Sequence, residues 1–286
     1  MHERTLAATG KQNGNSGQRR TIMNRERILE VALTMLGAVL PIITAPGAWA
    51  QQSTPPASDQ KMNRSREATA QPLKLQCSGP PASDQKSIAV FEQQAAKGDA
   101  AAQCGLGKMY ALGQGVPRDN AQAALWYRKA AEQGYAKAQD YLGYLYYDGQ
   151  GVPQDNTQAA VWYRKAAERG DANAQFMLGE LYADGQGVPH DYAQAAFWFR
   201  KAAEQGDAGA QDALGEAYND GLGVPQDYAE AYFWIDLGVA GELDASIRKN
   251  DAAYRDMVAS HLTPADLSRE QERARKWFEE HQTKPQ

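Results

Sequence analysis

The sequence predicts an all-α solenoid of antiparallel helix pairs, on the strength of three observations. One pattern recurs every 36 residues, in four copies, from residue 102 onward. Within each copy the apolar residues have helical spacing, and glycine and proline turn signals separate the helices. Self-similarity at this period indicates a solenoid rather than a single closed core. The clearest recurring columns are Trp126, Trp162, Trp198 and Trp234; Tyr110, Tyr146, Tyr182 and Tyr218; Gly107, Gly143, Gly179 and Gly215; and Pro117, Pro153, Pro189 and Pro225.

Composition agrees with a globular protein and argues against several functions. Of the 286 residues, 43% are hydrophobic and 23% are charged, which is an ordinary globular balance. The net charge of -5 disfavours a nucleic-acid partner held by bulk positive charge. Two cysteines and four histidines do not suffice for a disulfide framework or a four-cysteine zinc site. We therefore expect no metal site and no cofactor.

Residues 1–50 have the parts of a secretory signal peptide. Arg25 and Arg27 precede an apolar stretch over residues 28–44, and Ala48 and Ala50 supply the small residues of a cleavage site. Residues 1–22 fit a spurious extension upstream of the true start. The alternative is an uncleaved anchor, although a membrane span needs about 20 apolar residues. We expect an exported protein, periplasmic or secreted, with no transmembrane segment after cleavage.

Export has two consequences for the remaining chain. Cleavage removes six basic and three acidic residues, which lowers the net charge from -5 to -8. Residues 51–86 are rich in Gln, Pro and Ser and contain too few apolar residues to offset the entropy of ordering, so a disordered linker is expected. Residues 55–61 return as residues 80–86, either as a docking motif presented twice or as a small duplication in a tolerant spacer.

Each repeat reads as two helices joined by a turn. In the second copy, Ala138, Leu142 and Tyr146 form the apolar stripe of a first helix. Gly143 beside this stripe favours a close approach by another helix. Glycines 149 and 151 end the helix, and the proline that follows prevents its continuation.

The second helix of each repeat opens on an aspartate. Asp155 with Gln158 three residues later resembles a capping box. Ala159, Trp162 and Ala166 then form the face that we expect to be buried. Charged residues four apart, such as Arg128 and Glu132, indicate a solvated face of ion pairs.

The repeat loses its regularity at both ends. Residues 91–98 look like a lone second helix, and residues 247–260 and 264–280 look like two capping helices. Thr263 and Pro264 form a good helix start. We therefore place the solenoid at residues 87–246 and its C-terminal cap at residues 247–286.

These columns resemble the Sel-one-like repeat family, a relative of the tetratricopeptide repeat, over roughly residues 88–245. The resemblance implies a right-handed superhelix and a role as adaptor or scaffold for protein assemblies. Exported members are similar in serving envelope signalling, exopolysaccharide machinery or host contact. A cysteine-rich branch pairs the two helices of each repeat by disulfides, and this sequence lacks those pairs. The third copy carries the motif as Ala174, Leu178, Gly179, Tyr182, Gly185, Gly187, Val188, Asp191, Ala195, Trp198, Ala202, Ala203 and Gly206.

Three tyrosines are candidates for partner binding. Tyr141, Tyr144 and Tyr147 stand where other copies carry mostly small, charged or aliphatic residues. In solenoids of this kind the first helices line the concave surface, and exposed tyrosine is favoured at interfaces. The alternative is local packing between neighbouring repeats.

The two cysteines offer one covalent link. Cys77 and Cys104 are 27 residues apart, and a disulfide formed after export would stabilise the fold by about 3 kcal/mol. The alternative is two free thiols.

The favoured function is an exported adaptor that binds a partner protein or peptide in the concave groove of its repeats, in envelope signalling or assembly. The alternative is a cell-wall or β-lactam hydrolase on the same scaffold, which would need a nucleophile or an acid–base pair that the sequence does not reveal. A purely structural scaffold within an export complex is the third possibility. We expect no enzymatic activity and no nucleic-acid partner.

Overall fold

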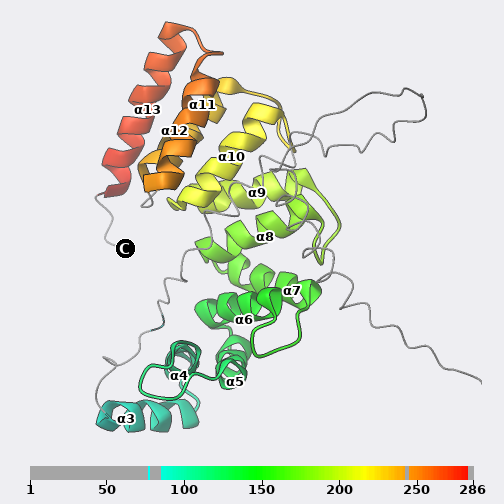
Figure 1. The fold of residues 1–286 in the computed structure, drawn as a ribbon, viewed down its shortest axis with the longest axis vertical. Coiled ribbons are helices and arrows are strands. Elements are labelled where there is room, and N and C mark those ends of the chain that lie inside the picture. Colours follow the sequence, from blue (N-terminus) through cyan, green and yellow to red (C-terminus); the bar gives the residue numbers. More distant parts are fainter. Residues whose placement is uncertain (1–76, 78–84, 242–244, 283–286) are drawn as a thin grey trace, which may run out of the picture. The chain divides into compact units, whose positions relative to one another are not determined.

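The computed structural model describes Cys77, residues 85–241 and residues 245–282, all within the unit Thr54–Gln286. The predicted signal peptide at residues 1–50 and nearly all of the predicted linker lie outside the described residues. The described part of the chain forms eleven α-helices and no strand (Figure 1). The predicted all-α class is confirmed.

The helices alternate between first and second members of repeated pairs (Figure 1). Each first helix packs against the second helix of its own pair, and from the second repeat on also against that of the preceding pair, as in an antiparallel solenoid. The lone helix α3 (Gln85–Ala96) packs on α4 at the N-terminal end. The first helices are α4 (Ala100–Leu112), α6 (Ala136–Asp148), α8 (Ala172–Asp184) and α10 (Ala208–Asp220). The second helices are α5 (Asn120–Glu132), α7 (Asn156–Glu168), α9 (Tyr192–Ala203) and α11 (Tyr228–Gly241).

Aspartate side chains begin most of these helices. The Oδ1 atom of Asp155 accepts hydrogen bonds of 2.9 and 3.0 Å from the amides of Thr157 and Gln158, as the capping pattern predicts. Asp171 likewise accepts from the amide of Ala174 at the start of α8. Tyr135 occupies the corresponding position before α6 and makes no side-chain capping bond. The helix starts are therefore fixed by the same contact in most copies.

The invariant glycine of each first helix seats a large side chain from the second helix. A β-carbon at Gly143 would lie 2.8 Å from the ring of Tyr163, which is too close for a real contact. The close approach predicted from Gly143 is therefore confirmed. The same pairing joins Gly107 to Tyr127, Gly179 to Phe199 and Gly215 to Ile235.

The tryptophan column is less buried than the sequence led us to expect. Trp234 is buried, whereas its three counterparts in the earlier repeats are half-buried. The side chain that reaches the core is the next residue, such as Tyr163. On a helix of 3.6 residues per turn, the buried residues Ala159, Ala160, Ala166 and Ala167 put Tyr163 at the centre of the inward face and Trp162 at its edge.

A buried glutamine joins each repeat to the one before it. The side-chain amide of Gln139 donates a 3.0 Å hydrogen bond to the carbonyl of Ala131, at the end of the preceding second helix. The same carbonyl also accepts from the amide of Gly134 at 2.9 Å, so the glutamine supplies a second hydrogen bond at the helix end. Equivalent bonds run from Gln103 to Ala95, from Gln175 to Ala167 and from Gln211 to Ala203.

From the second repeat on, the second glycine of the loop lies against the backbone of the preceding repeat. Gly151 has a φ of 72°, in the left-handed region, and a β-carbon there would overlap the backbone of Asn120. Both the conformation and the contact therefore require glycine. The same fit joins Gly187 to Asn156 and Gly223 to Tyr192.

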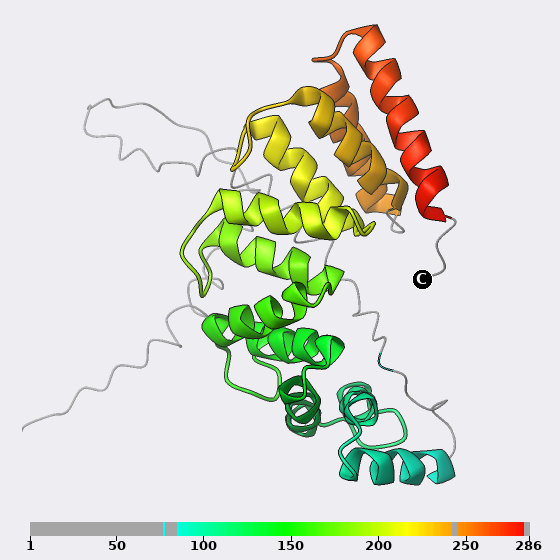
Figure 2. The ribbon, with the colours of Figure 1, turned by 180° about the vertical axis from the view of Figure 1, so that it is seen from behind.

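Helices α12 (Ala245–Ala259) and α13 (Pro264–Gln282) follow the fourth repeat, where two capping helices were expected. Both pack against α11 (Figures 1 and 2). Trp277 and Phe278 of α13 pack against the core cluster that contains Phe233 and Trp234. The cap thus covers the last apolar surface of the repeats, as a solenoid requires.

Candidate interaction surfaces

One stripe of the first helices changes its side chains from repeat to repeat. At the position of Tyr144 the other copies carry Lys108, Glu180 and Glu216, and all four side chains are half-buried. By contrast, the second helices of the first three repeats carry the same Trp, Arg and Lys columns. We name the positions of Tyr144, Tyr147 and Asp148 the first-helix stripe; in the third repeat they carry Glu180, Ala183 and Asp184.

Tyr141 is not part of an exposed patch, and its inclusion in one is corrected. Only 2% of its surface is accessible, and its ring centroid lies 5.1 Å from that of Tyr127. The two rings pack between α5 and α6. Tyr141 therefore serves local packing between neighbouring repeats, the alternative to partner binding. Because a ring from the preceding helix covers it, this tyrosine has no area left for a partner.

Tyr144 and Tyr147 remain half-buried on α6. Both pack against the core cluster formed by α7 and α8, which leaves part of each side chain accessible. The Tyr144 hydroxyl donates to a carboxylate oxygen of Asp148 at 3.3 Å. Partial burial, followed by the nearby Asp148 carboxylate, raises the pKa of Tyr144. Tyr144 therefore stays neutral, and both tyrosines present apolar rings with polar tips, a combination that suits an interface.

Carboxylates stand beside these tyrosines along the stripe. Asp148, Asp184 and Asp220 occupy one column, one residue from each successive first helix. Glu180 and Glu216 add a second column at the position of Tyr144. This arrangement makes the stripe complementary to a cationic segment.

The arginine column joins neighbouring repeats and does not form the ion pairs expected with residues such as Glu132. Arg164 donates a 2.7 Å hydrogen bond to the Tyr182 hydroxyl on the first helix of the next repeat. Its guanidinium carbon also lies 5.8 Å from the centroid of that ring. Arg128 with Tyr146 and Arg200 with Tyr218 make the same link.

A carboxylate is buried where the second and third repeats meet. Asp140 on α6 lies close to Asp171, which itself pairs with Lys137 at 2.8 Å. Burial, and then the neighbouring Asp171 carboxylate, raise the pKa of Asp140 to about 7. Asn173 and Lys137 act in the opposite direction. This group makes the junction between two repeats sensitive to pH.

The structure joins Cys77 to Cys104 by a disulfide, with the Cα atoms 5.8 Å apart. Both side chains are buried in the core cluster of the first and second repeats. The link ties a residue of the predicted linker to α4, and the pairing in the exported protein stays a prediction.

The described residues contain neither a membrane-spanning helix nor a metal-binding group. None of the described helices combines the length and apolarity of a membrane span. Across the part of the chain that the structure describes, no group of three or more His, Cys, Asp or Glu side chains is placed to hold a metal ion.

Paired helices, invariant packing columns and a varied stripe define an α-solenoid of the repeat type that presents an interaction surface. The Sel1 repeat model matches residues 100–135, 136–171, 172–207, 208–238 and 260–280, and the chain belongs to this family. The last match falls mainly on α13, so the C-terminal cap contains a partial repeat. The resemblance seen in the sequence is confirmed.

Two solved structures are similar to this chain. A Sel1 repeat protein from Oxalobacter formigenes has 33% identity and a TM-score of 0.57, over 72% of this chain and 82% of that one. A protective antigen of uropathogenic Escherichia coli, c5321, displays an SLR fold and has 31% identity and a TM-score of 0.47, over 70% of this chain and 52% of its own. No curated protein matches this sequence. Sel1 repeat proteins generally mediate protein–protein interactions and are typically non-enzymatic.

Proposed function

We propose that this chain is an exported adaptor that holds a partner protein or peptide on its first-helix stripe, in envelope signalling or assembly. One observation carries the proposal. The packing columns repeat almost unchanged, whereas the pair of side chains at the positions of Tyr144 and Tyr147 differs in each copy: Lys108 with Ala111, Tyr144 with Tyr147, Glu180 with Ala183, and Glu216 with Asn219. Stacking alone requires only the repeated columns. The stripe therefore supplies an ordered, non-repeating set of groups that can recognise a single partner.

The chemistry of the stripe favours a partner segment with basic residues. Tyr144 and Tyr147 offer anchors with little conformational freedom to lose, and tyrosine is enriched among the residues that dominate binding energy. The aspartate column beside them favours lysine or arginine in the partner. The signal-like N-terminus and the disulfide are consistent with an oxidising compartment outside the cytoplasm.

Crosslinked capture from the native envelope tests the adaptor function. A tagged chain is compared with a Tyr144→Ala, Tyr147→Ala variant and with a Glu168→Ala control, an exposed residue of α7, the other helix of the same pair. A partner recovered with the wild type and the control, and about tenfold less with the double variant, is the expected result. Thermal unfolding of all three proteins checks that the fold is retained. Equal recovery by the double variant would show that the partner does not bind through these two tyrosines and would contradict the first-helix stripe as the binding surface.

Two further measurements separate this function from its alternatives. Turnover of nitrocefin or peptidoglycan by the pure protein would overturn the adaptor in favour of a hydrolase, and we expect none. The intact mass of the protein recovered from the cell envelope checks export. We expect a chain that begins at Gln51.

A further inference from the structure

The second helices carry an exposed apolar ridge on the first three repeats. Its members, one per helix, occupy one position of the 36-residue pattern and are 47%, 37% and 49% exposed: Leu125, Val161 and Phe197. Each precedes a half-buried tryptophan. Exposed apolar residues are common singly, but a column continued over three neighbouring helices calls for a physical reason.

Ordered cations lie next to this ridge. The Nζ atom of Lys129 lies 4.0 Å from the ring centroid of Trp126, the residue after Leu125. The Nζ atom of Lys165 lies at the same distance from the ring centroid of Trp162, the residue after Val161. Lys201 lies 5.6 Å from the ring of Phe197. Cation–π contacts of this kind hold the ammonium groups beside the apolar surface. The ridge is therefore both apolar and positively charged.

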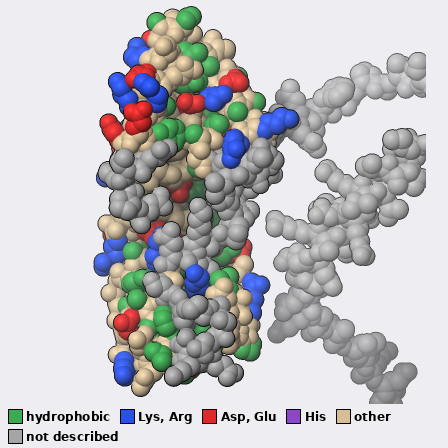
Figure 3. All heavy atoms as spheres, turned by 90° about the vertical axis from the view of Figure 1, so that its left-hand side faces the viewer, with side chains coloured by type: hydrophobic (Ala, Val, Ile, Leu, Met, Phe, Trp, Pro, Cys, Tyr) green, Lys and Arg blue, Asp and Glu red, His purple; other side chains and the backbone are tan. Residues whose placement is uncertain are grey.

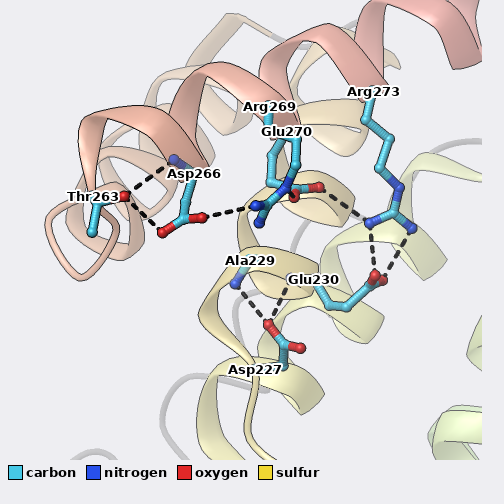
Figure 4. A network of polar contacts seen from close by, with 8 residues as sticks. All are labelled: Asp227, Ala229, Glu230, Thr263, Asp266, Arg269, Glu270 and Arg273. Carbon is cyan, nitrogen blue, oxygen red and sulfur yellow. Dashed lines mark hydrogen bonds and ion pairs between the residues drawn. The ribbon is translucent and has the colours of Figure 1, made fainter.

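The fourth repeat shows what covers this position. Phe233, the counterpart of Phe197, is only 3% exposed because α13 lies over it. Arg273 of α13 places its guanidinium carbon 3.7 Å from the Phe233 ring centroid and donates to Glu230 at 2.6 Å (Figure 4). The Trp234 indole donates to the same carboxylate at 3.1 Å. An amphipathic helix is thus the cover that this surface accepts.

The charge of the surface changes between the fourth repeat and the others. Glu230 is replaced by glutamine in the first three repeats, and Leu237 is replaced by lysine. The covered surface therefore carries a carboxylate, which receives Arg273 of α13, and charged side chains gather near this end of the unit (Figure 3). The uncovered ridge carries lysines at Lys129, Lys165 and Lys201, which disfavour a helix that presents basic side chains beside its apolar face, as α13 presents Arg273.

We infer that the ridge is a second docking surface, separate from the first-helix stripe, and that it binds an amphipathic helix of a partner protein with acidic residues beside its apolar face. The apolar face of that helix covers Val161 and Phe197 as α13 covers Phe233. The carboxylates of that helix pair with the ridge lysines. In the fourth repeat the charges are the other way round, because Arg273 of α13 pairs with Glu230. The ridge continues the surface on which α13 packs, so it fits a helix. Its charge is opposite to that of the α13 site, so we expect the helix to be acidic and not α13 itself.

A pair of synthetic peptides tests this inference on the full chain. One has the α13 sequence Pro264–Gln282, and the other is the same peptide with R269E, R273E and K276E. Fluorescence anisotropy measures the binding of each labelled peptide. We expect the acidic peptide to bind at least about tenfold more tightly than the unmodified one. A variant with K129E, K165E and K201E is expected to reverse this preference.

Single-surface variants place the binding and identify failure. Phe197→Ser with Val161→Ser is expected to abolish binding of the acidic peptide, whereas Tyr144→Ala on the first-helix stripe leaves it unchanged. This separation makes failure of the ridge distinguishable from failure of the proposed adaptor. Absence of binding, equal binding of both peptides, or binding unaffected by the serine variant would overturn the inference. Ridge-dependent dimerisation seen by sedimentation would overturn it in favour of a second copy of the chain.

Discussion

Asn173 on α8 donates a hydrogen bond of 2.8 Å to the carboxylate of Asp140 on α6, across the junction of the second and third repeats. Asp140 has almost no accessible surface, so the acceptor end of this partly buried bond is shielded from water. Asn173 itself is exposed. The junction therefore contains an acid whose protonation is coupled to how two repeats pack.

The first prediction concerns pH. The pKa of Asp140 is about 7 in the folded chain against 3.8 for an unperturbed aspartate, so the folded state binds more protons between these values. Its contribution to the free energy of unfolding therefore falls as pH rises from about 4 to 7. Asp140→Asn removes this loss, and the variant is expected to exceed the wild type at pH 8 by on the order of 2 kcal/mol.

Urea unfolding of both proteins from pH 4 to pH 8 measures this difference. The two stabilities are expected to converge near pH 4, where the wild-type carboxyl is neutral. Curves that run parallel across the range would show that Asp140 does not titrate there.

The second prediction concerns the glycine seat. Gly143→Ala places a methyl group against the ring of Tyr163, and overpacking of this kind costs about 1–3 kcal/mol. Alanine also has the better helix propensity, which raises the free energy of unfolding by about 1 kcal/mol and offsets part of this cost. We expect a net loss of about 1–2 kcal/mol in thermal or urea unfolding. A gain in stability, as at an unpacked helical glycine, would contradict the seat.

The third prediction concerns the attachment of α13. Arg273 links Glu230, Glu270 and the Phe233 ring, so Arg273→Ala is expected to increase protease sensitivity and hydrogen exchange in α13. The Arg273 side chain is 43% exposed, so its coupling to Glu230 in a double-mutant cycle is expected to be about 1 kcal/mol. Arg275→Ala is the matched control, because Arg275 pairs only with Glu272 of the same helix among the contacts described. Equal effects of the two substitutions would contradict the role of Arg273.

The fourth prediction concerns the link between Cys77 and Cys104. The intact mass of the exported protein is expected to increase by two hydrogen atoms on reduction. Loss of the bond, by reduction or by Cys77→Ser, is expected to lower the free energy of unfolding by about 3 kcal/mol. An unchanged mass would identify two free thiols.

The repeated columns made the fold predictable, because the same residue at the same position in several copies indicates that packing or a turn requires it there. Leu142 and Gly143 recur with their loop glycines, so helix ends and close contacts could be assigned from sequence. The glutamine column of Gln139 was equally visible. A polar residue recurring in an apolar helix is a sign of a buried hydrogen bond, and this sign was overlooked.

The candidate surfaces were less predictable, because exposure depends on neighbours that are distant in sequence. Tyr141 differs from its counterparts just as Tyr144 does, yet only Tyr141 is covered by Tyr127. Spacing along one helix also suggested that arginine would pair with glutamate. An exposed ion pair of that kind contributes little in water, so the tyrosine hydroxyl of the next repeat replaces it.

The fit of Gly151 against Asn120 has a consequence for how such a chain can change over generations. Because the loop glycine must reach the backbone of the preceding copy, adding or deleting one residue in the loop would displace every copy that follows. A duplication or loss of all 36 residues leaves each fit intact. The gene is therefore expected to vary in length by whole copies, while the loops between helices keep a fixed number of codons.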